Sequence, residues 1–229
     1  MKGMFYSVGV GPGDPELLTV KAVRVLEQCQ VIAAPKTRSG QMLALEIAKG
    51  AANLAGKEIL PLCFAMEGSP EQQKAAHQEA FLQICARLDA GLNVAMPNLG
   101  DVSIYATAGY LTELLQQAGY VTRMIPGVPS FCAVAAALNT SLTEMDEPVH
   151  ILPGGDDTLE EELGLKGTKI LMKAGRRFEK VRAALQKNGL EAAAAMVENC
   201  GLPGQQVYQS LEDCKTAPGY FATIIVKSK

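Results

Sequence analysis

The first stretch of this sequence that could bind a ligand spans residues 5–19, FYSVGVGPGDPELLT. An apolar run predicts a buried strand, and Gly9, Gly11 and Gly13 then supply a turn whose backbone can approach a bulky group closely. The spacing matches neither GxGxxG nor GxxxxGK[ST], and the acidic Asp14 beside the turn would repel a phosphate. The turn therefore favours a neutral or cationic ligand, although a tight turn without any ligand explains the glycines equally well.

A second candidate turn follows the apolar run 93–97, NVAMP, which continues into NLGDVSIYAT. Gly100 and Asp101 come directly after this predicted strand, and open parallel sheets bind their ligands at the carboxyl ends of strands. Asp101 can supply a negative charge to a cationic ligand or accept a proton. Taken alone, it is also a common turn or cap residue.

Composition restricts the classes of function. The 229 residues carry a formal net charge of -3, which argues against a nucleic-acid binder, and no apolar run approaches the length of a membrane span. Only two histidines, His77 and His150, are present, so a multi-histidine metal site is not expected. Six scattered cysteines without a CxxC pair indicate reduced thiols in the cytoplasm.

Alternating strands and helices predict an α/β protein with about five strands in each half. The predicted strands are 5–10, 31–35, 58–62, 93–97 and 120–125, then 149–153, 169–173, 192–197, 205–211 and 221–226. A helix is expected at about 103–118, and the last two strands, with no helix between them, are expected to pair antiparallel. The break at Pro126–Pro129 predicts two domains, 1–126 and 127–229, with a ligand cleft between them.

Six segments, taken in order, resemble the tetrapyrrole (corrin/porphyrin) methyltransferases along nearly the whole chain. They are GVGPGDPELLT, NLGDVSIYAT, IPGVPSF, ILMKAGRRF, MVENCGLPGQQ and YFATIIV. The resemblance implies two α/β domains and S-adenosylmethionine as cofactor. Within the family, DVSIY at 101–105 and the segments MKAGRRF and YFATIIV most resemble the C(20)-methyltransferases of cobalamin biosynthesis. Val102 departs from the proline that many relatives have there.

The resemblance also implies a set of site residues. Those expected to bind the cofactor are Leu99, Gly100, Asp101, Ser103, Ile104, Ser130, Phe131, Met172, Asn199, Cys200 and Ala222. Pro12 and Gly13, in the glycine loop of the first domain, are expected to face the substrate, and the second domain contributes to the cofactor site. The substrate carries many carboxylates, so basic residues at strand ends or in loops are expected to bind it: Lys36, Arg38, Lys173, Arg176 and Arg177.

The expected reaction is methylation of carbon 20 of cobalt-factor II, or of precorrin-2. The resemblance implies a homodimer, and neither a membrane nor a nucleic acid is expected as a partner. Asp101 is the first candidate for the general base and Tyr105 the second. Two alternatives stay open: methylation of another macrocycle position, and a non-catalytic tetrapyrrole carrier or chelatase.

Overall fold

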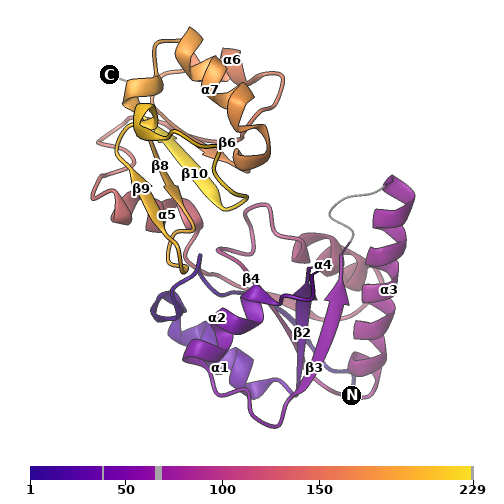
Figure 1. Cartoon of the computed structure of the whole chain (residues 1–229). Helices are drawn as coiled ribbons and strands as arrows, with labels where there is room; N and C mark the ends of the chain where they lie inside the picture. Colours follow the sequence, from indigo (N-terminus) through magenta and orange to yellow (C-terminus); the bar gives the residue numbers. More distant parts are fainter. Residues whose placement is uncertain (38, 65–68, 228–229) are drawn as a thin grey trace. The chain divides into compact units, whose positions relative to one another are not determined.

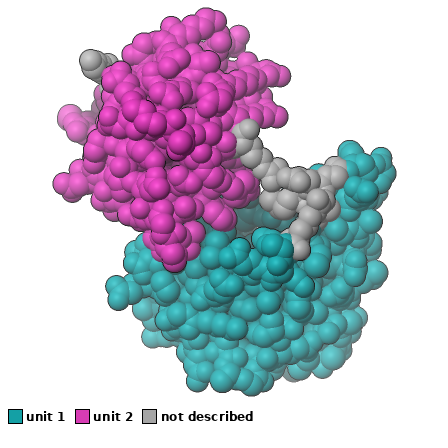
Figure 2. All heavy atoms as spheres, in the orientation of Figure 1, with its two compact units in different colours: residues 1–129 teal, residues 130–229 magenta. Residues whose placement is uncertain are grey.

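The computed structural model describes residues 1–37, 39–64 and 69–227. The chain divides into two compact units, Met1–Pro129 and Ser130–Lys229, which are coloured separately in Figure 2. The first unit ends at Pro129, whereas the sequence analysis placed the boundary after Pro126. Each unit contains one five-stranded sheet, as the sequence analysis predicted.

The first unit is a parallel sheet with the strand order β3-β2-β4-β1-β5. Its strands are β1 (Phe5–Gly9), β2 (Val31–Lys36), β3 (Glu58–Cys63), β4 (Val94–Asn98) and β5 (Thr122–Ile125). Its helices are α1 (Val20–Gln28), α2 (Leu43–Ala51), α3 (Pro70–Asp89) and α4 (Ala108–Gln117), preceded by the short 3₁₀ helix η1 (Pro15–Leu17). In Figure 1, α1 and α2 cover one face of the sheet while α3 and α4 cover the other. Because the strands are parallel, their carboxyl ends all lie at one edge, which we call the carboxyl edge of the sheet.

Side chains in the opening turn fix the entry into the first helices. The carboxylate of Asp14 accepts a hydrogen bond from Glu16 N at 2.9 Å and caps η1, which begins with Pro15. Thr19 Oγ1 accepts one from Ala22 N at 3.1 Å and caps α1. Asp14 and Thr19 therefore each cap a different helix.

Proline limits the pairing in the middle of the first sheet. Strands β2 and β4 pair only at Val31 with Val94 and at Ile32 with Ala95. Pro35 and Pro97 follow in these strands, and proline has no N–H with which to continue the ladder. The carboxyl ends of β2 and β4 therefore part, and each leads into its own loop.

The helix expected at about 103–118 begins later than predicted, at Ala108. Tyr105 has φ 50°, in the left-handed region, which an α-helix cannot include. The segment between β4 and α4 is consequently a loop, and it carries most of the predicted site residues of this unit.

The second unit is a mixed sheet with the strand order β6-β7-β10-β8-β9. Its strands are β6 (Val149–Pro153), β7 (Thr168–Met172), β8 (Ala194–Glu198), β9 (Gln206–Tyr208) and β10 (Ala222–Val226). Its helices are α5 (Ser130–Ala137), α6 (Leu159–Leu163) and α7 (Phe178–Lys187). The predicted pairing of the last two strands is wrong: β9 and β10 both pair antiparallel with β8, on opposite sides of it.

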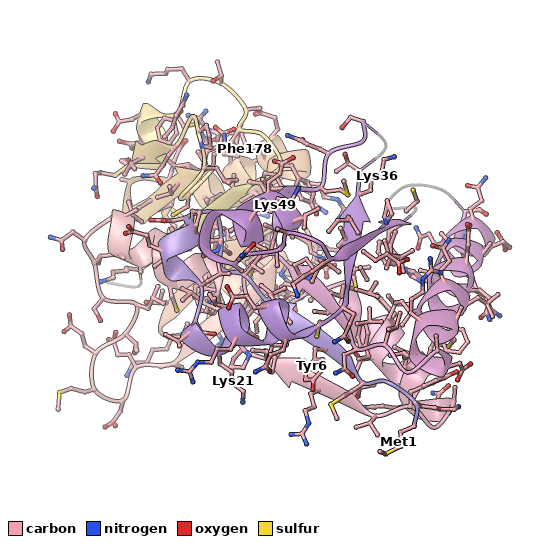
Figure 3. All side chains as sticks on the ribbon, turned by 90° about the horizontal axis from the view of Figure 1, so that it is seen from below. Met1, Tyr6, Lys21, Lys36, Lys49 and Phe178 are labelled. Carbon is pink, nitrogen blue, oxygen red and sulfur yellow. The ribbon has the colours of Figure 1, made fainter. Side chains whose placement is uncertain are left out.

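Alternating side chains of the second sheet enter two separate cores. Ile224 of β10 packs in a cluster with Phe178 of α7, whose position is labelled in Figure 3. The next residue, Ile225, packs with Val134 of α5. Since successive strand residues point to opposite faces, α5 covers one face of the sheet and α6 and α7 cover the other.

Candidate functional site

Three glycine backbones meet at the carboxyl edge of the first sheet. Gly9, Gly100 and Gly127 follow or end β1, β4 and β5, which are neighbours in the sheet. A Cβ atom on Gly127 would lie 2.3 Å from the Gly100 carbonyl oxygen, and one on Gly9 would lie 2.6 Å from Gly127 N. Only glycine fits at Gly9 and Gly127 without a backbone shift, so the main chains of three loops pack directly against one another.

The glycine loop after β1 is tied to the loop after β4. Gly11 and Gly100 exchange two backbone hydrogen bonds, with Gly100 N donating to Gly11 O at 2.8 Å and Gly11 N donating to Gly100 O at 3.3 Å. Both residues have positive φ, 75° for Gly11 and 68° for Gly100. The glycines that the sequence singled out therefore shape one continuous main-chain surface.

Asp101 joins this surface to the loop after β5. Its Oδ2 accepts a hydrogen bond from Gly127 N at 2.8 Å. Its Oδ1 accepts one from Ser103 N at 2.8 Å and a second, short one from the Ser103 hydroxyl. Each carboxylate oxygen thus has a donor within its own unit.

These contacts decide the charge of Asp101. Partial burial alone would raise the pKa of this carboxyl, but hydrogen bonds from the Ser103 hydroxyl and from the N–H groups of Ser103, Gly127 and Val102 outweigh it and hold the pKa below its usual range. Asp101 is therefore an anion at neutral pH. A carboxylate with a lowered pKa suits a cationic ligand and is a weak proton acceptor.

The other predicted residues of the first unit lie in the same loops. Leu99 and Ile104 are half-buried, and Tyr105, with its left-handed backbone, is 46% exposed. In the glycine loop Gly13 is buried and Pro12 half-buried. Lys36 ends β2 at this edge (Figure 3), whereas Arg38 lies outside the described residues.

The second unit gathers its predicted cofactor residues at one edge of its sheet. Strand β8 ends at Glu198 opposite Ala222, where β10 begins, and β7 ends at Met172 beside them. Asn199 follows β8 with φ 52°, and its N–H donates to Phe221 O at 2.9 Å. Met172, Asn199 and Ala222 therefore lie at a common edge.

Helix α5 packs on the same sheet through Val134 and Ala135. It begins with Ser130 and the half-buried Phe131, and it packs in the apolar cluster that also contacts Cys200. Burial raises the pKa of the Cys200 thiol. Cys200 thus presents a neutral, weakly polar group.

The predicted basic residues of the second unit differ in their contacts. Lys173 follows β7 and is exposed, with φ 58°. Arg177 Nη1 donates to Gly155 O at 2.6 Å, which fixes the turn after β6. The side chain of Arg176 lies outside the described part of the chain. Their assignment to the substrate stays a prediction.

Glu198 is a residue of this edge that the sequence analysis did not include. Its Oε1 accepts a hydrogen bond from Gly219 N at 2.6 Å, which holds the segment entering β10 against the end of β8. Its position as a carboxylate at the end of an apolar strand was the available signal. Its partner, far along the chain, was not predictable from spacing.

The described residues contain neither a helix that could span a membrane nor a cluster of metal-ligating side chains. None of the helices within 1–37, 39–64 and 69–227 has both the length and the apolar character required to cross a bilayer. In the same ranges, no three His, Cys, Asp or Glu residues gather as a metal site would require.

The sequence over residues 4–214 matches the family model of the Tetrapyrrole (Corrin/Porphyrin) Methylases. The chain belongs to this family of methyltransferases. It is 29% identical over 237 residues to the cobalt-precorrin-2 C(20)-methyltransferase of Salmonella typhimurium, covering 100% of this chain and 98% of the relative. It is 37% identical over 177 residues to the probable cobalt-precorrin-2 C(20)-methyltransferase of Methanocaldococcus jannaschii, covering 77% and 74% of the two chains.

Solved structures show the same fold. The cobalt precorrin-4 methyltransferase CbiF has a TM-score of 0.76 at 22% identity, covering 98% of this chain and 94% of that one. A uroporphyrin-III C-methyl transferase from Thermus thermophilus, complexed with S-adenyl homocysteine, has a TM-score of 0.73 at 21% identity, covering 99% and 98%. The predicted α/β fold with two sheets is confirmed.

The pKa of Asp101 predicts a pH-dependent stability. Its folded pKa lies below the unfolded value of about 3.9, so the folded state binds fewer protons and the carboxylate stabilises the fold above about pH 4. This stabilisation is lost as the pH falls through the folded pKa. Asp101→Asn does not titrate, so we expect the difference in unfolding free energy between wild type and variant to be largest near pH 7 and to shrink below about pH 4.

Urea denaturation between pH 7 and pH 3 measures this difference. Ser103→Ala keeps the charge but removes one donor, and should show a smaller loss of stability with the same sign of pH dependence. A difference between wild type and Asp101→Asn that stays constant with pH would contradict the assignment.

Proposed function

We propose that this methyltransferase transfers a methyl group from S-adenosylmethionine to carbon 20 of a tetrapyrrole in cobalamin biosynthesis. The substrate is cobalt-factor II, in preference to the metal-free precorrin-2. The names of the Salmonella and Methanocaldococcus relatives support this position on the macrocycle. The observation that carries the proposal is the ionised Asp101 beside a surface of packed glycine main chains.

The residues at both edges fit S-adenosylmethionine by their chemistry. Its sulfonium is a cation, and Asp101 supplies an anion beside the packed main chains of Gly9, Gly100 and Gly127. When bound, the cofactor supplies a methyl group, and its sulfur keeps the electron pair of the broken bond. We propose that these residues of the first unit bind it: Leu99, Gly100, Asp101, Ser103 and Ile104. From the second unit we propose Ser130, Phe131, Met172, Asn199, Cys200 and Ala222.

The protein's part in the reaction is alignment and the removal of a proton from carbon 20. The hydrogen bonds of Asp101 hold the loop after β4 in one form, which orients the reacting groups. Asp101 and Tyr105 stay the candidates for the proton acceptor. Tyr105 is the more exposed of the two, and its left-handed backbone keeps the segment between β4 and α4 out of the helix.

The proposal extends to the substrate side and to the assembly. Pro12, Gly13, Lys36 and Lys173 would meet the macrocycle and its carboxylates, since cations at strand ends can pair with them. All six cysteines are free thiols, which supports a reducing, cytoplasmic location. A homodimer rests on the family resemblance alone.

Methylation can be tested directly. The protein should convert cobalt-factor II to a product heavier by one methyl group when S-adenosylmethionine is present, and convert precorrin-2 more slowly. Mass spectrometry of both incubations measures this. Methylation of neither substrate would overturn the proposal, and methylation of precorrin-2 alone would reverse the assignment of the metal state.

Gly100→Val should abolish binding of S-adenosylhomocysteine. A β-branched residue at φ 68° is strained, and its side chain would enter the main-chain surface proposed for the cofactor. Gly119→Val is the matched control, because Gly119 has φ 79° and nothing within 4 Å of its Cβ position. Calorimetry should show that only Gly100→Val loses the ligand; equal affinities in the two variants would place the cofactor elsewhere.

Asp101→Asn separates proton transfer from loop anchoring. Because both oxygens already accept hydrogen bonds, we expect weaker S-adenosylhomocysteine binding and a nearly unchanged single-turnover rate at saturating cofactor. A fall of about 10²-fold or more in that rate with unchanged affinity would instead identify Asp101 as the base. Tyr105→Phe, measured in the same way, tests the second candidate.

A further inference from the structure

Three aromatic side chains from separate segments of the first unit lie in a row, with one stacked pair and one tilted pair of rings. The His77 ring on α3 lies 5.1 Å from the Tyr110 ring on α4, with 18° between the planes. The Phe64 ring lies 5.7 Å from the His77 ring at 53°. We call Phe64, His77 and Tyr110 the aromatic cluster.

The aromatic cluster lies at the carboxyl edge of the first sheet. Phe64 follows Cys63, the last residue of β3, which pairs with Lys36 at the end of β2. Tyr110 lies in the first turn of α4, directly after the loop that carries Asp101 and Tyr105. In Figure 1, α3 and α4 lie on the same face of the sheet. The cluster therefore flanks the proposed site within one unit.

Packing of the protein interior does not account for the whole cluster. Phe64 is half-buried against the core between the sheet and α3, which explains its position. His77 is also half-buried, but Tyr110, which stacks on it, is 61% exposed. Tyr110 thus adds an open aromatic face to the side of the cluster away from the core, where folding gains little from it.

The chemistry of this edge matches a flat, conjugated ligand with peripheral carboxylates. Aromatic rings stack on a conjugated ring system with a preference for offset faces. Lys36, at the neighbouring strand end, is a cation that can pair with a carboxylate. A nucleotide would also stack, but the acidic Asp14 and Asp101 at the same edge oppose its phosphates.

We propose that the aromatic cluster binds one flank of the tetrapyrrole substrate, with Tyr110 and His77 contacting the macrocycle and Lys36 pairing with a peripheral carboxylate. This inference rests on the proposed function and adds residues to its substrate site. It predicts that the cluster determines affinity for the macrocycle and not affinity for the adenosyl ligand.

The test uses the full chain and uroporphyrin III, a fluorescent polycarboxylate macrocycle, as the probe. Fluorescence titration gives its Kd for wild type, Tyr110→Ala, His77→Ala and Tyr110→Phe. We expect the two alanine variants to raise the Kd about 5- to 10-fold, the scale of one lost aromatic contact, and Tyr110→Phe to bind as wild type does. Leu82→Ala is the matched control, since Leu82 is also on α3 and 58% exposed but is no member of the cluster.

Calorimetry with S-adenosylhomocysteine on the same proteins separates the two proposals. Unchanged affinity for it in the alanine variants, with weaker macrocycle binding, supports the inference. Macrocycle binding that is absent in wild type, or equal in wild type and both alanine variants, overturns it while leaving cofactor binding intact. If the wild-type protein does not bind S-adenosylhomocysteine, the proposed function is wrong. The macrocycle titration still decides the role of the cluster in that case.

Discussion

The loops at the carboxyl edge of the first sheet depend on one contact, the hydrogen bond from Gly127 N to Asp101 Oδ2. It joins the loops that follow β4 and β5, while Gly11 joins the loop after β1 to Gly100 beside it. Removing the carboxylate would leave the Gly127 N–H without this acceptor, which is costly for a partly buried main-chain donor. Together with the hydrogen bonds from Ser103 and Val102, the same contact holds the pKa of Asp101 below its usual range.

Three of the five non-glycine residues with positive φ in the described chain lie in the loops at these edges, and the other two, Asn139 and Met145, lie between α5 and β6. Tyr105, Lys173 and Asn199 all have φ between 50° and 58°, and each belongs to a loop at one of the two strand-end edges. Non-glycine residues reach this region at a free-energy cost, and such residues concentrate at functional sites. Asparagine tolerates it well, so Tyr105 and Lys173 are the more informative of the three.

Much of the fold could be predicted from local sequence signals. The apolar runs located the strands, because hydrophobic patterning acts within a few residues, whereas the separate caps that Asp14 and Thr19 form on η1 and α1 are visible only in the structure. The strand order β10-β8-β9 could not be predicted, because β8, the strand that separates β9 from β10, comes earlier in the chain. Nor could the late start of α4, because the left-handed turn at Tyr105 depends on its surroundings in the fold.

The site was predictable to a similar extent. Gly100 and Asp101 were recognised from their position after an apolar run, but the donors that lower the pKa of Asp101 include Gly127, which lies in another loop. His77 looked like an ordinary helix residue, since nothing in its own segment points to Tyr110. These features of the site depend on contacts between segments far apart in the chain, which local sequence patterns do not reveal.

The position of Gly127 has a consequence for biosynthesis. It lies close to Pro129, where the first unit ends, yet it supplies a donor to a loop built much earlier in the chain. A chain that grows from its N-terminus can complete this loop only after almost all of the unit has been made, and domains generally fold as units during synthesis. Formation of this hydrogen bond would then report that the first unit has been completely synthesised and folded, which makes it a natural probe of folding on the ribosome.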